Sequence, residues 1–223
     1  ELTEKLNTMS VKVQSIFSHL SSSDVAEEKE FTLNQIKTFE KNSSHLINNL
    51  GYKPLRHILN SAGITNYSDD QYDMVRIGIG MIGESSNKNI KKQLQDSVSF
   101  KTVVSQISEV EPGESVGYSR KYKADHNTKI ATIPVGYADG IPRMVGNKVG
   151  NVGINKKLCP IVGNVCMDMM MIDVDKANVK EGDSVVIFNS SPTLEEFSKY
   201  CNTITYEVLT SISPRVKRIY IKN

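Results

Sequence analysis

The chain has 223 residues, of which 39% are hydrophobic, and its 27 basic and 25 acidic side chains leave a net charge of +2. This composition fits one large or two ordinary globular domains, and it excludes a basic surface that would favour nucleic acid or an anionic membrane. Its apolar runs, such as 161–165 and 169–174, are far shorter than the roughly 18 residues that span a membrane. We therefore expect a soluble, cytoplasmic protein that binds a small molecule.

Three cysteines are present, at 159, 166 and 201, and they form no CxxC pair. This pattern favours reduced thiols over disulfides and gives no reason to expect a bound metal.

The first part of the chain alternates short apolar strands with helices, which is typical of parallel α/β structure. In chain order, the predicted elements are a strand at 11–17, a helix at 26–49, a strand at 55–59, a short helix capped by 68–70 and a strand at 74–77.

After a polar stretch at 84–96 the pattern changes to β structure, with Pro-Gly, Asp-Gly and Gly-Asp turns between apolar segments. The predicted strands are 101–110, 129–135, 157–162, 169–174, 184–188 and 215–221, and short helices are predicted at 193–200 and 204–211. The sequence therefore predicts an α/β domain at 1–96 followed by an all-β domain at 97–223.

Three short motifs place reactive side chains beside small residues. The segment 131–140, ATIPVGYADG, aims Tyr137 out of a bend flanked by glycines. The segment 163–168, GNVCMD, forms a second turn after an apolar strand, and 74–80, MVRIGIG, sets Arg76 just before backbone N–H groups freed by two glycines. Together these motifs predict an active site.

These motifs, in this order, resemble the alanine racemases, which are pyridoxal-phosphate enzymes built from a TIM barrel and a small β-domain. The resemblance runs from about Val11 to Tyr220 and includes IFSH at 16–19, HILNSAG at 57–63 and YEVLT at 206–210. It implies an α/β plus all-β fold, in which about the last three βα units of a TIM (β/α)8 barrel precede a β-barrel-like C-terminal domain. In the family, the lysine that carries the cofactor and a substrate-binding arginine lie upstream of anything present here, so the resemblance implies a C-terminal fragment that lacks the N-terminal part of its barrel. Three parallel strands also leave apolar faces uncovered, and these need a partner.

The resemblance also implies how pyridoxal 5′-phosphate would bind. The cofactor-binding residues would be His19, His57, Ser61, Arg76, Gly78 and Ile79. The Ser61 hydroxyl and the N–H groups of Gly78 and Ile79 suit a phosphate. Arg76, which cannot lose its proton, would face the pyridine nitrogen and keep it unprotonated.

Purely structural roles are the alternative interpretation of these residues. The glycines at 78 and 80 can serve only to bend the chain, and Arg76 can form a structural ion pair with Asp73. His57 fits the cofactor pocket and the scaffold equally well.

By the same resemblance, Tyr137, Arg76 and His19 would be the catalytic residues, with His19 linking the arginine to the tyrosine. Tyr137 would accept the α-proton of L-alanine, while a lysine missing from this chain would act on the opposite face. The Met167 N–H would hold the substrate carboxylate and Asp168 would shape the turn, although a plain β-turn beside a Met-rich core is the alternative. The family's β-domain reaches into the partner's barrel, which implies a homodimer with shared active sites.

One position departs from the family. Pro214 stands where many members have a tyrosine that touches the phosphate and narrows the path to the substrate. A preference for serine, or a broader substrate range, therefore stays open.

The sequence thus favours an alanine racemase that interconverts L- and D-alanine for peptidoglycan synthesis. A muramyl-peptide ligase fused upstream is a further possibility. We expect this chain alone to be inactive because the Schiff-base lysine is missing. The alternatives are a related barrel-fold enzyme, such as a broad racemase or a decarboxylase, and a non-catalytic cofactor-binding or assembly fragment; Arg76 argues against a decarboxylase.

Overall fold

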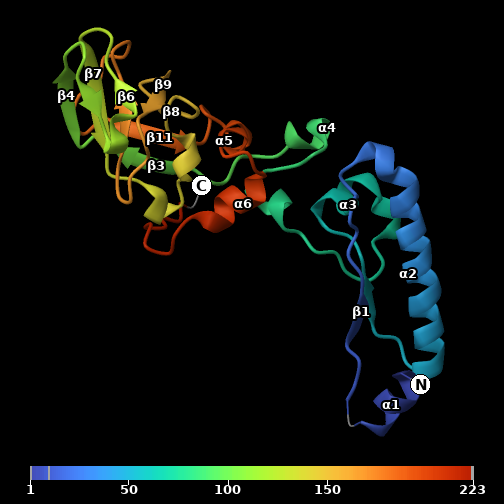
Figure 1. Ribbon diagram of the computed structural model, residues 1–223. Coiled ribbons are helices and arrows are strands. Elements are labelled where there is room, and N and C mark those ends of the chain that lie inside the picture. Colours follow the sequence, from blue (N-terminus) through green and yellow to red (C-terminus); the bar gives the residue numbers. More distant parts are fainter. Residues whose placement is uncertain (1, 10, 222–223) are drawn as a thin grey trace. The chain divides into compact units, whose positions relative to one another are not determined.

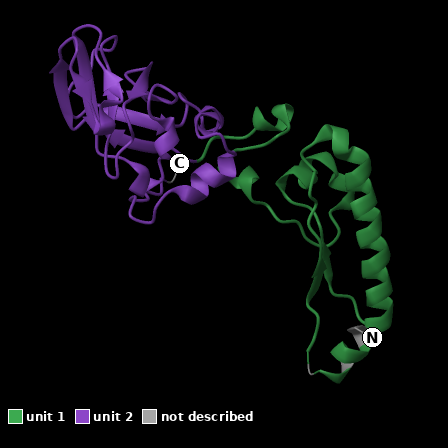
Figure 2. Cartoon of the chain, viewed as in Figure 1, with its two compact units in different colours: residues 1–97 green, residues 98–223 purple. Residues whose placement is uncertain are grey.

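The computed structural model describes residues 2–9 and 11–221. Tertiary contacts divide the chain between Ser97 and Val98 into two compact units, which we call unit 1 and unit 2 (Figure 2). Within the described part, no helix is both long and apolar enough to cross a membrane.

Unit 1 consists of one long helix beside two parallel strands (Figure 1). Its helices are α1 (Leu2–Thr8), α2 (Lys29–Leu50), α3 (Ser61–Asn66) and α4 (Lys88–Lys91), its strands are β1 (Ser15–Phe17) and β2 (Leu55–His57), and its short 3-10 turns are η1 (Ala26–Glu28), η2 (Ser68–Asp70) and η3 (Ile79–Ile82). The two strands pair with Ser15 opposite Leu55 and Phe17 opposite His57. Both strands therefore end at the same edge of the sheet, where the segments after them meet.

The helix α2 buries one face and exposes the other. Thr32, Ile36, Phe39 and Ser43 are its buried residues, and their spacing of three and four keeps them on one side of the helix. Of these, Ile36 and Phe39 pack in a small core with Leu20, Ile58 and Leu59.

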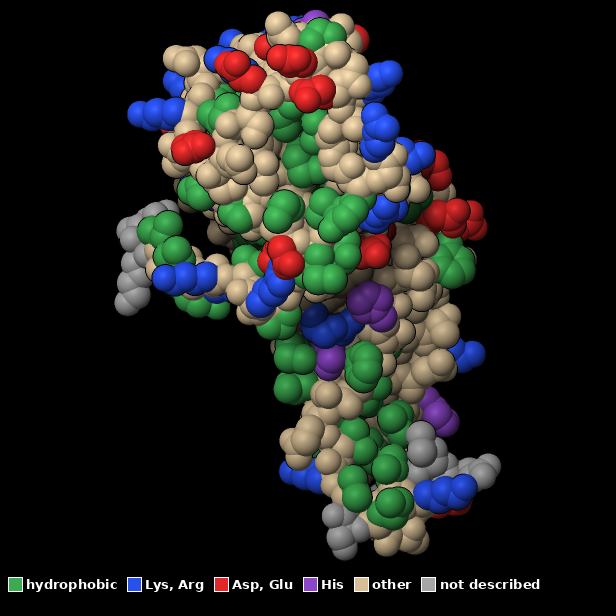
Figure 3. Space-filling model, turned by 60° about the vertical axis from the view of Figure 1, so that its left-hand side comes forward, with side chains coloured by type: hydrophobic (Ala, Val, Ile, Leu, Met, Phe, Trp, Pro, Cys, Tyr) green, Lys and Arg blue, Asp and Glu red, His purple; other side chains and the backbone are tan. Residues whose placement is uncertain are grey.

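Other apolar side chains of unit 1 are open to solvent. Phe17 is 66% exposed and Phe31 is 50% exposed, and both line a groove of about 960 Å³ along α2 and β1. Figure 3 shows hydrophobic side chains at the surface of the chain among polar ones. Unit 1 thus presents apolar surface of the kind that a further layer of structure would cover.

The prediction of three βα units is not confirmed. Residues 74–77 form no strand. The backbone–backbone bonds from 73–77 to the β2 region are the N–H of Asp73 to Arg56 O at 3.1 Å and the N–H of Arg76 to Leu59 O at 3.0 Å. These two bonds lie too far apart to make a ladder. The strand predicted at 11–17 is also shorter than expected, beginning at Ser15.

Unit 2 is built on a seven-stranded antiparallel sheet with the order β3-β11-β8-β9-β10-β7-β4. Its strands are β3 (Phe100–Val103), β4 (Gln106–Val110), β7 (Thr128–Ile133), β8 (Asn151–Ile154), β9 (Lys157–Val162), β10 (Met170–Asp173) and β11 (Ser184–Phe188), and a separate hairpin joins β5 (Ser115–Val116) to β6 (Tyr122–Lys123). The helical elements are η4 (Tyr118–Arg120), η5 (Tyr137–Asp139), η6 (Arg143–Val145), α5 (Leu194–Tyr200) and α6 (Thr205–Ser211).

The core of unit 2 lies between this sheet and α5 and α6. Phe188 packs against Phe100 and Phe197, with ring centroids 5.9 Å and 5.8 Å away respectively. Alternate residues of β7 and β10, such as Ile133 and Ile172, are fully buried beside them. A continuous core of this kind gives the connecting loops a rigid base.

Several β predictions need correction. The segment 101–110 forms two strands, because the chain turns at Val104 and Ser105. The strand predicted at 215–221 is wrong, since its described residues form no strand. The sequence reading also missed β8, which pairs with β9.

Candidate functional site

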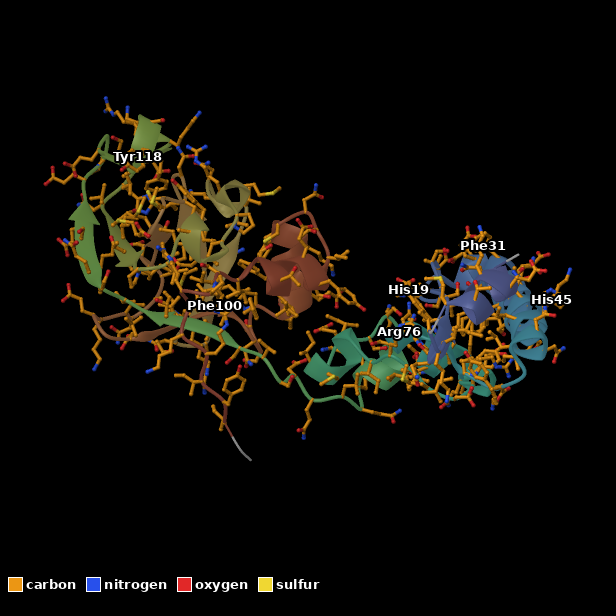
Figure 4. The ribbon with its side chains drawn as sticks, turned by 90° about the horizontal axis from the view of Figure 1, so that it is seen from below. His19, Phe31, His45, Arg76, Phe100 and Tyr118 are labelled. Atoms are coloured by element: carbon orange, nitrogen blue, oxygen red, sulfur yellow. The ribbon has the colours of Figure 1, made fainter. Side chains whose placement is uncertain are left out.

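Arg76 ties together the segments that follow β1 and β2. Its Nη2 donates to Ser18 O at 2.9 Å and to Ile58 O at 3.3 Å, and it lies 3.1 Å from His19 Nδ1. Its Nη1 lies 2.6 Å from His57 Nδ1. Figure 4 shows Arg76 and His19 on the same unit. Since arginine has only donors, both imidazoles must accept through Nδ1.

His57 is a buried partner of this arginine. It is 6% exposed, and its ring stacks on that of Phe17 with a centroid distance of 5.4 Å and an angle of 5° between the planes. Burial, followed by the charge of Arg76, lowers the pKa of His57. A neutral His57 therefore fixes the guanidinium without competing with its charge.

The ion pair that was the alternative for Arg76 is not seen. Asp73 instead accepts from Lys53 Nζ at 2.8 Å and from the Arg56 N–H at 2.9 Å. Within the described part of the chain, the hydrogen bonds of Arg76 run through Nη1, Nη2 and the backbone, which leaves Nε–H as a donor for a ligand.

Ser61 and the glycines after Arg76 form a polar cradle. Ser61 is the first residue of α3, and its Oγ accepts from Gly78 N at 2.9 Å and from Gly80 N at 3.3 Å. With two N–H groups directed at its oxygen, the hydroxyl proton is left to point outward toward an acceptor. A Cβ at Gly78 would meet nothing closer than Ser61 Oγ at 3.9 Å, so the cradle is open on that side.

Tyr137 begins the short turn η5 in unit 2. The Asp139 carboxylate accepts from Gly136 N at 2.9 Å and so closes the turn on itself. Tyr137 is 45% exposed, as expected for a phenol directed out of a tight bend.

The Tyr137 turn is joined to the turn that carries Met167 and Asp168. Tyr137 N donates to Cys166 O and Ala138 N donates to Met167 O, both at 3.0 Å. A Cβ at Gly136 would lie 2.3 Å from Cys166 O, so only glycine permits this approach. The structure thus brings the Tyr137 motif together with the motif that carries Met167 and Asp168.

The sequence reading missed a second tyrosine at this place. Tyr118 is 71% exposed, and it lines a pocket of about 490 Å³ together with Cys166, Met167 and Asp168. Tyr137 does not line this pocket. Asn164, which is buried, holds the Tyr118 backbone by donating from Nδ2 to Tyr118 O at 3.0 Å.

A sequence signal for Tyr118 was available. Gly117-Tyr118 repeats the Gly-Tyr pair of Gly136-Tyr137, and both tyrosines start a 3-10 turn. Gly117 has φ 77°, and the neighbouring residues Ser119 and Arg120 have φ 60° and 50°. Such left-handed conformations at adjacent residues mark a tightly shaped turn.

The candidate residues thus fall into two groups. His19, His57, Ser61, Arg76, Gly78 and Ile79 belong to unit 1, whereas Tyr118, Tyr137, Met167 and Asp168 belong to unit 2. Among the residues that the structure describes, no group of three or more His, Cys, Asp or Glu side chains is arranged to hold a metal ion.

Comparisons with known families give one consistent result. Residues 1–86 match the alanine racemase N-terminal domain, and residues 97–220 match the alanine racemase C-terminal domain. Alanine racemase 1 of Clostridium acetobutylicum is 40% identical, covering 95% of this chain and 56% of the relative. Alanine racemase 1 of Oceanobacillus iheyensis is 36% identical, covering 99% of this chain and 60% of the relative.

Solved structures show the same likeness. Alanine racemase of Clostridium difficile 630 in complex with cycloserine superposes with a TM-score of 0.90 at 33% identity, covering 100% of this chain and 60% of that one. Alanine racemase from Bartonella henselae with covalently bound pyridoxal phosphate gives a TM-score of 0.84 at 32% identity, covering 98% and 61% of the two chains. The chain therefore spans about three-fifths of the length of the relatives it matches.

Proposed function

The chain belongs to the alanine racemase family, and from this premise we propose that it is the C-terminal part of a pyridoxal-phosphate enzyme that interconverts L- and D-alanine. The observation that carries the proposal is the Arg76 guanidinium fixed between His19 and His57 beside the Ser61 cradle. In the bacterial cell this activity would supply D-alanine for peptidoglycan, and the cytoplasm is where we expect it to act.

The residues of unit 1 fit pyridoxal phosphate by their chemistry. The outward hydroxyl proton of Ser61 and the backbone N–H groups of Gly78 and Ile79 would bind the phosphate. The free Nε–H of Arg76 would bind the ring nitrogen, while His19 and His57 hold the guanidinium in place. We accordingly assign residues 1–96 to a partial cofactor-binding barrel and 97–223 to the β-domain.

When bound, pyridoxal phosphate supplies a conjugated ring that delocalises negative charge from the substrate α-carbon. The permanent positive charge of Arg76 would keep a proton off the ring nitrogen, because two cationic groups that share one hydrogen bond repel each other. Arg76 would thereby limit the charge that the cofactor withdraws and favour return of the proton to the same carbon. This property suits racemisation.

Racemisation needs a proton acceptor on one face of the substrate and a donor on the other. In our proposal a tyrosine phenol from unit 2 acts on one face, and a lysine outside this chain acts on the other. The Met167 N–H would hold the substrate carboxylate and Asp168 would shape the turn that presents it.

Two tyrosines are candidates for the proton-transfer group. The family resemblance pointed to Tyr137, whereas the pocket shared with Met167 and Asp168 favours Tyr118. In the complete protein, we expect Tyr118→Phe to lower kcat by about 100-fold to 10,000-fold and Tyr137→Phe to change it much less. The opposite ranking would assign the role to Tyr137, and two unchanged rates would exclude both.

The apolar groove along α2 and β1 supports the proposal that unit 1 packs against further strands of the barrel. Phe17 and Phe31 are half or more exposed there, as expected of barrel surface that further strands cover in the intact protein. We also propose a homodimer in which the β-domain of one copy completes the site of the other.

The direct test uses the complete protein with pyridoxal phosphate and L-alanine, followed by chiral chromatography of the product. We expect sustained formation of D-alanine by the complete protein and none by residues 1–223 alone. A complete protein that loads the cofactor yet forms no D-alanine would contradict the proposal. A parallel assay with L-serine addresses the question that Pro214 raises.

The rival proposals predict other outcomes of the same assay. Release of carbon dioxide from an amino acid would indicate a decarboxylase, and equal rates on many amino acids would indicate a broad racemase. Cofactor binding without turnover would favour a non-catalytic cofactor-binding or assembly role.

A further inference from the structure

Arg215 forms ion pairs with two carboxylates that belong to different turns of unit 2. Its Nε donates to Asp139 Oδ1 at 2.7 Å and its Nη2 donates to Asp168 Oδ1 at 2.6 Å. Asp139 closes the Tyr137 turn, and Asp168 follows Met167 in the neighbouring turn. One guanidinium thus connects both turns that carry candidate site residues.

Asp139 makes the central contacts of this arrangement. It is 8% exposed, and while one carboxylate oxygen accepts from Arg215, the other accepts from Gly136 N at 2.9 Å. Its backbone O also accepts from Ser213 N at 3.2 Å, which brings the Arg215 segment alongside. Removing the guanidinium would leave a nearly buried carboxylate with only backbone support.

The pKa of Asp139 also reflects its contact with Arg215. Burial acts to raise the pKa of Asp139, but the hydrogen bonds from Arg215 and from the Gly136 N–H outweigh it and lower the pKa. Asp139 consequently depends on this cation for compensation, whereas Asp168, whose side chain is 56% exposed, is also solvated.

The backbone at this junction has little free space. A Cβ at Gly140 would lie 2.4 Å from Ser211 O, and a Cβ at Gly136 would lie 2.3 Å from Cys166 O. Three segments, 136–140, 166–168 and 211–215, therefore approach as closely as backbone allows. A small displacement of one segment would move the others.

We propose that Arg215 is a positioning residue that holds the Tyr137 turn and the Met167–Asp168 turn in a single arrangement. Asp139, Gly136 and the two backbone bonds from Tyr137 and Ala138 transmit its effect. The catalytic consequence, a fixed carboxylate-binding N–H beside the proton-transfer tyrosine, rests on the proposed racemase function. The structural linkage of the two turns does not rest on that function.

The structural test is amide hydrogen exchange on the complete protein and its variants. We expect Arg215→Ala to accelerate exchange several-fold in peptides that cover 135–141 and 164–170, because the Tyr137 and Ala138 amides lose their fixed acceptors. Exchange in β8 and β9 should stay as in the wild type. Lys217→Ala is the matched control, since it removes a charge from the same segment without touching either carboxylate.

Arg215→Lys tests whether both ion pairs are needed or only a positive charge at this position. A single ammonium can reach one of the two carboxylates, so we expect it to restore slow exchange in one turn and leave the other fast. Unchanged exchange in both turns of Arg215→Ala would overturn the proposal. So would equally faster exchange throughout unit 2, including β8 and β9, because the effect would then be general loss of stability.

The catalytic test is steady-state kinetics of the same variants in both reaction directions. We expect Arg215→Ala to lower kcat by up to about 100-fold with unchanged cofactor absorbance, and Arg215→Lys to recover part of that loss. Altered exchange with an unchanged kcat would overturn the catalytic part. A wild-type protein without racemase activity would refute the proposed function, and the exchange results would still decide the linkage.

Discussion

At the scale of single residues, the site depends on a guanidinium whose position is fixed by its surroundings. Arg76 is a permanent cation, and it is surrounded by acceptors that include two imidazoles and the backbone oxygens of Ser18 and Ile58. A lysine would offer three donors from one point and could not reach the same set. Arg76→Lys is therefore not conservative at this position.

The buried His57 makes the stability of the chain depend on pH. Because its pKa is lowered in the folded protein, the unfolded chain binds more protons below the ordinary histidine pKa of about 6.5. We expect the wild type to lose stability as the pH falls from about 7 to about 5, at no more than about 1.4 kcal/mol per pH unit from this residue. His57→Asn should lack this component in urea titrations; equal pH slopes for both proteins would contradict the assignment.

Gly136 is required for steric reasons alone. Its backbone is extended, at φ −146°, so alanine is strained there only by the nearby Cys166 and Met167 oxygens. We expect Gly136→Ala to cost about 1 to 3 kcal/mol in unfolding free energy and to change hydrogen exchange in the 166–168 turn.

Gly113→Ala is the control for that substitution. Gly113 has φ 92° and no atom within 4 Å of a built Cβ, so its alanine variant carries only the backbone cost of about 1 to 2 kcal/mol. Its exchange in the 166–168 turn should match the wild type. If both variants alter that turn alike, the close approach at Gly136 is not the cause.

At the scale of elements, α5 shows local sequence rules at work. Thr193 and Glu196 form a capping box, with Thr193 Oγ1 accepting from Glu196 N at 3.1 Å and Glu196 Oε2 accepting from Thr193 N at 2.7 Å. We expect Thr193→Ala to lower the unfolding free energy by about 1 kcal/mol. Thr210→Ala, on an exposed threonine of α6 that caps no helix, should stay within about 0.5 kcal/mol of the wild type in the same denaturation assay.

The strands show how far sequence patterns reach. The limits of β9 and β11 were predicted correctly, because each is a largely apolar run with a clear turn on one side, Gly163-Asn164 after β9 and Gly182-Asp183 before β11. By contrast, β8 was missed since its turn to β9 uses Asn155 and Lys156 at φ 48° and 65°, which is a left-handed pair without the usual glycine. Residues 215–221 read as a strand but find no pairing partner in the described chain, and a strand needs a partner.

The candidate site residues show the same limit of prediction from sequence patterns. The motifs around Arg76 and Met167 were visible because glycines or small residues flank them, and the structure joins Arg76 to His19 and His57. Tyr118 was missed because its only sequence signal is the repeated Gly-Tyr pair, while its pocket forms only when segments far apart in sequence meet. Arg215 was missed for the same reason, since its partners lie 76 and 47 residues away.

At the scale of the whole chain, the two units have cores of different size. Among the described residues, one cluster of five buried hydrophobic side chains lies in unit 1, whereas the main cluster of unit 2 has 22. We expect urea to unfold the chain in two steps, with unit 1 first. Amides of α2 should lose protection at lower urea than amides of β9, and a single step for both would contradict independent cores.

Separate cores also mean that folding and chemistry can fail independently. The guanidinium and imidazoles belong to one unit, and the phenols belong to the other. A variant library screened only for thermal tolerance would therefore retain many proteins that have lost turnover without any sign of it. On the proposed function, selection for growth without added D-alanine would detect those losses.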